Sequence, residues 1–433
     1  MRTTADGCGA GTGATSAVVV PAQPRESLRL VLMLGVLVAL GPFTIDMYLP
    51  ALPTISDELQ TTSTAVQLTL TGTLAGLGFG QLILGPLSDT FGRRRPLLAG
   101  TTVHVVASLL CVVAPNVAVL GVLRVLEGLG AAAASVVAIA VVRDLFTGVR
   151  AARMISRLVL VIGASPVLAP TVGGQMLRWT DWRGVFAALA VLGLAVTIMA
   201  AIALPETLPP ARRRTGGIPA TLRTYGGLLT DRTFVCLVLV SGLNASALFA
   251  YVAGSSFVFQ DQYGLSEHTF SLIFALNSVA NIGASQVNVV LLTWFQPHRI
   301  LVASLSLAVA SSLALVVVAL TGAGGLIGLL VPLFVLLGAI GLSGPNASAL
   351  GLSLHGESAG TAAALFGSLN FGLGALTAPI VGLLGNDSHA MAIAMAGGIA
   401  LASTVLVFGV RLRVLRAMDL SDPEPDPVPL PAS

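Results

Sequence analysis

Long apolar segments recur twelve times along this chain of 433 residues, and each is long enough to cross a hydrocarbon core of about 30 Å. The segments contain glycine and proline and lack the alternation of barrel strands, which favours helices. The sequence therefore predicts an all-α integral membrane protein with twelve transmembrane helices. The predicted spans are 28–50, 64–84, 96–115, 118–143, 154–177, 184–204, 234–256, 268–293, 299–320, 325–353, 359–384 and 389–411.

Composition excludes a soluble fold. Only 9% of the residues are charged and 55% are hydrophobic. In a soluble domain about a quarter of all residues are charged. A soluble fold of this composition would expose apolar surface everywhere.

The arginines predict the orientation of the chain. There is no lysine, and all of the 22 arginines except Arg124, Arg178 and Arg183 lie in or beside the two tails and the loops that follow even-numbered spans. By the positive-inside rule, both termini are expected in the cytoplasm. The expected location is the inner membrane of a bacterium. The net charge of +3 reflects this topology, and no basic stripe with interleaved aromatic residues predicts nucleic-acid binding.

Two tails and a linker divide the chain. Residues 1–27 and 412–433 are expected to be disordered cytoplasmic tails, because small residues dominate the first and proline and acidic residues the second. A cytoplasmic linker at 205–232 separates a first six-helix half at 28–204 from a second at 233–411.

The two halves resemble distant copies of one another. Ala169-Pro170-Thr-Val-Gly173 in the fifth span recurs 209 residues later as Ala378-Pro379-Ile-Val-Gly382 in the eleventh. Chance can also produce so short a match in a chain this rich in alanine and glycine.

A charged side chain inside a span costs at least ~2.5 kcal/mol at the bilayer centre unless it is paired or hydrated. Asp46 lies in the first span, four residues before Pro50. Desolvation raises the proton affinity of a carboxylate in a partly dry cavity, and a moving cation or water changes that affinity. We therefore expect Asp46 to bind and release a proton; an acid that is satisfied near the outer end of the helix is the alternative.

Arg124 and Glu127 lie one helical turn apart in the fourth span and so share a face. A buried arginine depresses the proton affinity of a neighbouring acid and can change partners when that acid is protonated. Glu127 could be a second proton site, or it could only neutralise Arg124 as a static ion pair. The predicted proton-coupling residues are thus Asp46, Arg124 and Glu127.

A charged hinge, Gly85-Pro-Leu-Ser-Asp89-Thr-Phe-Gly92-Arg93-Arg94-Arg-Pro-Leu97, separates the second span from the third. Asp89 can cap the positive end of a neighbouring helix while Arg93 reaches Asp144 at the end of the fourth span. Such a latch would hold one conformation, and positive charge that only sets topology is the alternative. The predicted gating residues are Gly85, Asp89, Gly92, Arg93, Arg94 and Asp144.

The fifth span carries paired prolines and paired glycines. Pro166 and Pro170 remove two backbone donors and bend the helix, whereas Gly173 and Gly174 let another helix approach closely. We expect these four residues to act through packing.

Amides and hydroxyls take the place of charges within the spans of the second half. Asn277 and Asn281 share a helical face and could line a cavity, although amides also join helix to helix in membranes. The candidates for a substrate cavity are Tyr48, Asn244, Tyr251, Asn277, Asn281 and Asn370.

These motifs together resemble the major facilitator superfamily of transporters. The hinge is similar to that family's Gly-x-Leu-x-Asp-Arg-x-Gly-Arg-Lys/Arg loop, with Thr90 in place of the first basic residue. Arg124-x-x-Glu127-Gly is similar to its Arg-x-x-Gln-Gly motif, which is linked with proton transfer, with Glu127 in place of the amide. The fifth span resembles its Gly-Pro-x-x-Gly-Gly motif, which marks antiporters, with Ala169 before the proline.

Within that superfamily the chain is similar to the Bcr/CflA group of drug:proton antiporters over residues 28 to 411. The resemblance rests on Asp46-Met-Tyr-Leu-Pro-Ala-Leu-Pro53, on Val142-Arg-Asp-Leu-Phe146 and on the fifth span. It implies two pseudo-symmetric six-helix halves with the substrate site between them. It also implies alternating access and proton-coupled efflux of small antibiotics such as chloramphenicol or bicyclomycin.

One alternative stays open, a proton-coupled exporter or symporter of a small metabolite such as a sugar or an amino acid, because a fold does not fix a substrate. An enzyme is not expected, since the five histidines are dispersed, and neither is a metal or another cofactor. An ATP-driven pump is disfavoured because the chain lacks a Gly-x-x-x-x-Gly-Lys-Ser/Thr loop. The expected partners are a small drug, protons and the lipid bilayer, and the expected state is a monomer.

Overall fold

The computed structural model describes residues 28–213, 217–355 and 358–410, so the predicted tails at 1–27 and 412–433 lie outside the described residues. Twelve of the described helices are long and apolar enough to cross a membrane, which confirms the predicted fold class. They are α1 (Leu28–Asp46), α3 (Ser63–Phe91), α4 (Arg94–Val112), α5 (Val117–Leu145), α6 (Gly148–Met176), α7 (Trp182–Ala203), α9 (Arg232–Phe257), α10 (Glu267–Leu291), α11 (Pro297–Thr321), α12 (Gly325–Ser353), α13 (Ala359–Leu384) and α14 (Ser388–Gly409).

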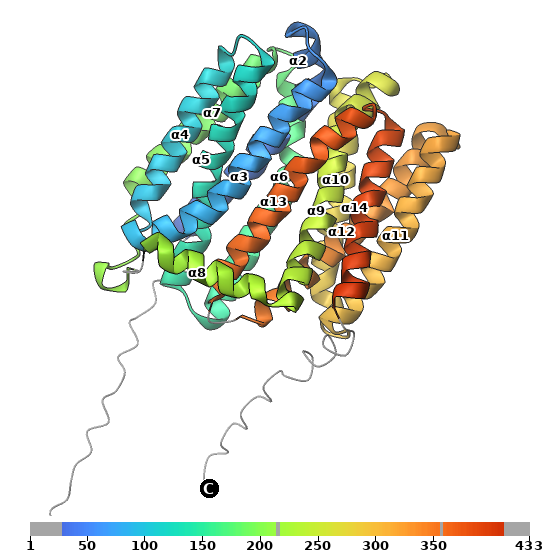
Figure 1. The fold of residues 1–433 in the computed structure, drawn as a ribbon. Helices are drawn as coiled ribbons and strands as arrows, with labels where there is room; N and C mark the ends of the chain where they lie inside the picture. The colour runs from blue at the N-terminus through green and yellow to red at the C-terminus, as the bar shows by residue number, and fades with distance from the viewer. Residues whose placement is uncertain (1–27, 214–216, 356–357, 411–433) are drawn as a thin grey trace, which may run out of the picture.

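The helices form two groups, α1 to α7 in blue to green and α9 to α14 in green to red (Figure 1). Two pairs of helices join the groups: α6 packs against α10, and α3 packs against α13. The second transmembrane helix (α3) thus packs against the eleventh (α13), and the fifth (α6) packs against the eighth (α10). These two pairs of helices border the space between the halves.

The hinge predicted at 85–97 is shorter than expected. Helix α3 continues through Pro86 to Phe91, and α4 begins at Arg94. Only Gly92 and Arg93 lie between the two helices, and Gly92 has a φ of 89°, which a glycine adopts without strain. A proline does not end a membrane helix when neighbouring groups satisfy the carbonyl that it frees, so the loop prediction was wrong for most of this segment.

The linker predicted at 205–232 contains a helix, α8 (Gly217–Thr230), which lies across the ends of the bundle (Figure 1). Tyr225 and Leu228, three residues apart, contact the bundle. Leu228 is 3% exposed, and the Tyr225 hydroxyl donates to the carbonyl of Leu82 in α3 at 3.3 Å. A search for long apolar spans misses this helix because it is short and apolar on one side only.

One end of the bundle is closed by hydrogen bonds between the halves. After α1 the chain makes a 3-10 turn, η1 (Leu49–Ala51), followed by the short α2 (Leu52–Glu58). Ser256 of α9 donates to the carbonyl of Leu49 at 2.7 Å. Gln260, in the π-helical turn η3 (Val258–Gln262), donates to the carbonyl of Pro50 at 3.0 Å.

The contact between α3 and α9 or α13 closes the same end. Thr64 donates to the carbonyl of Gly382, and Gln67 donates to the carbonyl of Ala253, both at 3.0 Å. We call this end of the molecule the closed end. The turn between α3 and α4 at Gly92 lies at the opposite end of α3, which we call the open end.

The repeated sequence places a glycine at a close approach in each half. A Cβ at Gly173 in α6 would collide with the backbone carbonyl of Met47. A Cβ at Gly382 in α13 would come within 2.7 Å of the side chains of Thr64 and Gln67. Small residues at these positions therefore let helices meet closely at the closed end, as membrane helices do generally.

We predict that Gly173→Ala lowers the free energy of unfolding by about 1–3 kcal/mol, because the added methyl group must displace a backbone segment. Thermal unfolding of the protein in detergent measures the change. Gly121→Ala in α5 is the matched control, since no atom lies within 4 Å of its added Cβ. Equal stability of the Gly173 and Gly121 variants would contradict the proposed packing role.

Candidate functional site

A cavity of about 310 Å³ lies between the halves and extends toward the open end. Side chains of α1, α3, α5 and α6 form one side, and α13 with Tyr225 of α8 forms the other. Much of its wall is apolar, including Val38, Leu77, Ile162 and Phe371. A larger hollow of about 440 Å³ lies between α3, α4 and α5, but no residue of the second half borders it. Of these two cavities in the described part of the chain, the smaller one is shared by both halves.

Most polar groups in this cavity were not predicted from the sequence. The unpredicted groups are Gln81, Ser88, Ser135, Arg143, Tyr225 and Thr361. Asp89 and Arg93 also line the cavity, but they were predicted as gating residues. Gln81 projects from α3 toward α13, where a Cβ on Gly367 would collide with its amide oxygen. Its polar side chain within the second span was the signal that could have drawn attention to it.

Asp46 ends α1 on the side of the cavity that faces the closed end. Gly41 and Pro42 of the same helix line the cavity, whereas Asp46 lies about one turn farther along and is 5% exposed. Among the described residues, no hydrogen bond or ion pair joins its carboxylate to another group. The Tyr251 side chain, from the second half, is near enough to interact with it electrostatically.

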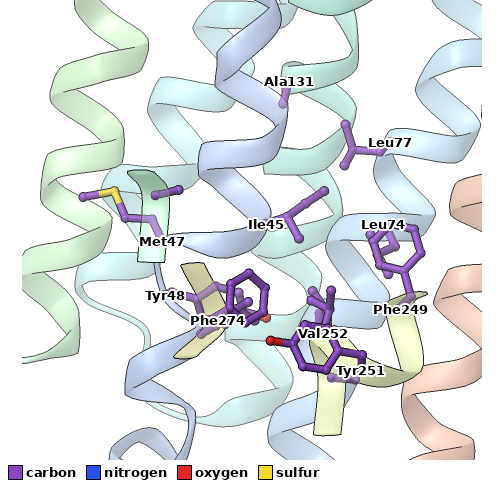
Figure 2. Packing of buried hydrophobic residues seen from close by; sticks show 14 of the residues in the cluster. Ile45, Met47, Tyr48, Leu74, Leu77, Ala131, Phe249, Tyr251, Val252 and Phe274 are labelled. Carbon is purple, nitrogen blue, oxygen red and sulfur yellow. The ribbon is translucent and has the colours of Figure 1, made fainter. Parts of the chain in front are cut away.

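Aromatic side chains from both halves pack near Asp46. Figure 2 shows Tyr48, Tyr251 and Phe274 gathered beside the chain that leaves α1. The rings of Tyr251 and Phe274 are stacked with centroids 5.2 Å apart, and all three side chains are at most 2% exposed.

Arg124 and Glu127 form an ion pair within α5. The Arg124 Nη1 donates to Glu127 Oε2 at 2.5 Å, and both side chains are fully buried. The other carboxylate oxygen, Oε1, accepts from the Ser108 hydroxyl of α4 at 2.7 Å. Arg124 also donates to the carbonyl of Thr44 at 2.8 Å, and its guanidinium lies 4.0 Å from the ring centroid of Tyr48.

Close helix packing keeps this pair away from the cavity. Cβ atoms at Gly76 of α3 or Gly128 of α5 would collide with the facing backbone. Neither Arg124 nor Glu127 lines the cavity. The pair is thus enclosed within the first half, while Asp46 lies where the two halves meet.

The predicted substrate residues of the second half join helices to one another. Asn244 donates to the carbonyl of Ile340, and Asn281 to that of Leu337, at 3.2 and 3.0 Å. Asn277 donates to the Tyr251 hydroxyl at 3.2 Å, and Asn370 accepts from Ser241 at 3.1 Å. None of these amides, nor Tyr48 or Tyr251, lines the cavity in this conformation, so their contact with substrate stays a prediction.

The packing of the fifth span involves both halves. Gly173 faces the end of α1, and a Cβ at Gly174 would collide with the hydroxyl of Ser271 in α10. Pro166 and Pro170 lie within the same helix, and the Pro166 carbonyl lies 3.4 Å from the hydroxyl of Ser278 in α10.

Arg93 joins the α3–α4 turn to the end of α5. Its Nε and Nη2 donate to the two carboxylate oxygens of Asp144 at 2.8 and 3.2 Å. Its Nη1 donates to Asp89 at 2.6 Å and to Ser88 at 2.8 Å. Burial alone would lower the pKa of Arg93, but the hydrogen bonds and charges of Asp144 and Asp89 outweigh it and raise that pKa.

All of these partners of Arg93 belong to the first half. Asp89 pairs with Arg93, whereas the sequence had suggested that it caps the positive end of a neighbouring helix. Arg94 lies on the other side of the turn, where it donates to the carbonyl of Ala201 at 2.5 Å. Gly85 borders the cavity and has open space around it.

Glu206 is an unpredicted partner of this turn. Its carboxylate accepts from the backbone N–H groups of Arg93, Leu208 and Arg94 at 2.8, 3.0 and 3.3 Å. Burial alone would raise the pKa of Glu206, but these backbone donors outweigh it and lower that pKa. The next residue, Thr207, donates to Asp144 at 3.0 Å. The segment after α7 thus holds the α3–α4 turn in place, although it lies outside the hinge in the sequence.

Comparison with known proteins gives the family. A family model described as Major Facilitator Superfamily matches residues 33–379. The chain is 36% identical over 366 residues to YdgK of Bacillus subtilis, described as an uncharacterized MFS-type transporter; 83% of this chain and 90% of the relative are covered.

Two further relatives have more specific names. The chain is 29% identical to a bicyclomycin resistance protein homolog of Haemophilus influenzae, with 91% of this chain and 99% of the relative covered. It is 32% identical to the multidrug resistance protein MdtL of Klebsiella pneumoniae, with 66% and 72% covered.

A solved structure agrees with the fold. The crystal structure of a D-xylose-proton symporter covers 88% of this chain and 97% of its own, with a TM-score of 0.68 and 18% identity. With its twelve apolar helices, its match over residues 33–379 and its identity to YdgK, the chain belongs to the Major Facilitator Superfamily and is a multi-pass membrane protein of a transporter family.

Proposed function

We propose that this protein exports small, uncharged or weakly polar antibiotics across a bacterial inner membrane in exchange for protons, by alternating access. The observation that carries the proposal is a cavity shared by both halves and closed at one end, with the Asp46 carboxylate beyond its inner wall and without an ion-pair partner among the described residues. The names of the bicyclomycin resistance homolog and of MdtL support drugs as the substrates.

The arginines support the orientation. Arg93, Arg94 and Arg95 lie at the open end, as does Arg150 at the start of α6. Positive charge is retained on the cytoplasmic side of membrane proteins. The cavity therefore faces the cytoplasm in this conformation, where an exporter takes up its substrate, and both ends of the chain belong on that side.

The chemistry of the cavity fits a neutral substrate with an apolar body. Leu77, Ile162 and Phe371 offer apolar contact, and Gln81 and Thr361 offer hydrogen-bonding groups. Arg93 is paired with Asp89 and Asp144, and the second cation of the wall, Arg143, is exposed instead of buried. An uncharged ligand with a few polar groups can bind such a wall without leaving a buried charge unpaired.

Asp46 is the proposed proton carrier. Its carboxylate lies at the meeting of the halves, and in the part of the chain described here it has no basic partner. A carboxylate in such surroundings binds a proton when it is dry and releases it when water reaches it. Inward movement of a proton yields ~2.3 kcal/mol per 100 mV of membrane potential.

Arg124 and Glu127 are the proposed static pair. Both oxygens of Glu127 already accept hydrogen bonds, from Ser108 and from Arg124. Arg124 thus has its countercharge one turn along its own helix, and the pair supplies a fixed, balanced charge close to the Tyr48 ring. Of the two roles considered for Glu127, the geometry favours this one.

The contacts of Arg93 support a gating role for the α3–α4 turn. They hold α3, α4, α5 and the segment after α7 as one body at the cytoplasmic end of the first half. Asp89 lines the same cavity as Gly360 and Thr361 in the first turn of α13, so movement of the halves can change its surroundings.

We predict that Asp46→Asn abolishes drug-induced proton movement, because an amide cannot carry a proton. The assay follows the lumenal pH of inside-out vesicles after chloramphenicol or bicyclomycin is added. Asp57→Asn is the matched control, since Asp57 is an exposed acid in α2. Full coupling in Asp46→Asn would reject the assignment of this carboxylate.

We predict that Glu127→Gln retains drug-induced proton movement in the same vesicles, because an amide can still accept from Arg124. Arg124→Met should instead lower the free energy of unfolding by about 3–5 kcal/mol, since it leaves a buried carboxylate unpaired. Thermal unfolding measures this second effect. Loss of proton movement in a stable Glu127→Gln protein would make Glu127 a proton site.

Drug-susceptibility profiling of cells that express the protein tests the substrate class. We expect protection against small neutral antibiotics, and Asp46→Asn should remove it. If no compound in a broad panel is affected, a metabolite carrier on the same fold becomes the better assignment.

A further inference from the structure

Pro379 leaves one carbonyl of α13 without a partner inside the helix. A proline has no N–H, so the carbonyl four residues before it, at Ala375, loses its normal hydrogen bond. In this structure the hydroxyl of Thr71 donates to that carbonyl at 3.0 Å. Thr71 belongs to α3, so the hydrogen bond joins the two halves.

The repeated proline in the first half has a similar but longer contact. Pro170 frees the carbonyl of Pro166, and the hydroxyl of Ser278 in α10 lies 3.4 Å from it. The same hydroxyl donates to the carbonyl of Phe274 at 2.8 Å. Each interface between the halves therefore has a proline-freed carbonyl that faces a hydroxyl of the other half, and the contact of Thr71 is the stronger one.

The same chemistry also occurs inside one half. Pro345 of α12 frees the carbonyl of Gly341, to which Ser285 of α10 donates at 2.8 Å. Both helices belong to the second half and need not separate during transport. This pair is a natural control for the pair formed by Thr71 and Ala375.

Thr71 lies between the cavity and the closed end. Its neighbours on the same face of α3 are Thr64 and Gln67, which also donate to carbonyls of the second half. Leu77, which borders the cavity, is six residues farther along, or roughly 9 Å. Opening of the closed end must therefore break the hydrogen bond of Thr71.

We propose that Thr71 is a positioning residue of the outer gate, and that Pro379 acts by offering the Ala375 carbonyl to it. The inference rests on the alternating access proposed above. While the halves are together, the hydroxyl satisfies a carbonyl that the helix cannot. When the halves part, water must replace the Thr71 hydroxyl as the partner of the Ala375 carbonyl. The hydrogen bond of Thr71 therefore stabilises the closed outer end and determines how often that end opens.

The test measures how often the closed end opens. A cysteine is placed at Val252, which is 5% exposed and lies one turn before Ser256 on α9, in a Cys8→Ser background. Its rate of reaction with a membrane-impermeant maleimide, added outside intact cells, follows the fraction of molecules whose outer end is open. The native Cys111 and Cys236 are buried in the two halves and report general loosening.

Thr71→Val is expected to raise the labelling rate of the cysteine by about threefold, the effect of one average membrane hydrogen bond. Thr71→Ser keeps the hydroxyl and should restore the original rate. Pro379→Ala returns an N–H to the helix and should raise the rate as Thr71→Val does. Because both changes remove one interaction, the double variant should react no faster than the single ones.

Ser285→Ala is the matched control and should leave the labelling rate unchanged. An unchanged rate in Thr71→Val, an equal rise in Ser285→Ala, or a rise that Cys111 shares would overturn the role of Thr71. If the cysteine at Val252 never reacts in otherwise native protein, the outer end does not open, and the alternating access on which the inference rests is rejected as well.

Discussion

The halves of this protein are held together at one end by side chains that donate to backbone carbonyls. Thr64, Gln67, Ser256 and Gln260 all bond in this way. In a membrane every backbone group needs a partner, and a carbonyl has two lone pairs, so it can accept a side-chain donor as well as a helical N–H. Two of the acceptors, Leu49 and Pro50, lie in the turn after α1, and the other two, Ala253 and Gly382, lie within a few residues of the ends of α9 and α13. The interface at the closed end therefore uses acceptors at turns and near helix ends.

Buried charged groups also need partners, and most of them here are balanced by side chains of opposite charge. Arg124 and Glu127 balance one another inside α5, where Ser108 and the Thr44 carbonyl complete their hydrogen bonds. Arg93 is balanced by Asp89 and Asp144 at the end of the first half. Asp46 is a buried acid at the meeting of the halves, and no ion pair balances it among the described residues. The proton affinity of a carboxylate without a countercharge responds most strongly to a change in its surroundings.

The sequence predicted the twelve helices well because long apolar segments in a membrane protein have few other structures available. It placed the ends less well. The charged segment at 85–97 was predicted as a hinge, yet α3 continues through Pro86, and the Tyr225 hydroxyl donates to the carbonyl of Leu82 that this proline frees. Such compensation comes from residues far away in the chain, and no local pattern reveals it.

The candidate site was predicted only in part for the same reason. The charged residues stood out because charge is costly in a membrane. Gln81 and Thr361 are ordinary polar residues whose importance depends on which face of a helix meets the cavity. Glu206 lies beyond the hinge in sequence, and only the folded chain brings it to the backbone of Arg93.

Helix α8 has a mechanical consequence for the whole molecule. It spans roughly 21 Å as a helix of 14 residues, and it packs against α3, α9 and α13. Because this one helix contacts both halves at the open end, any change in the distance between the halves there must alter the packing of α8. The linker is therefore a structural part of the bundle as well as a connection between its halves.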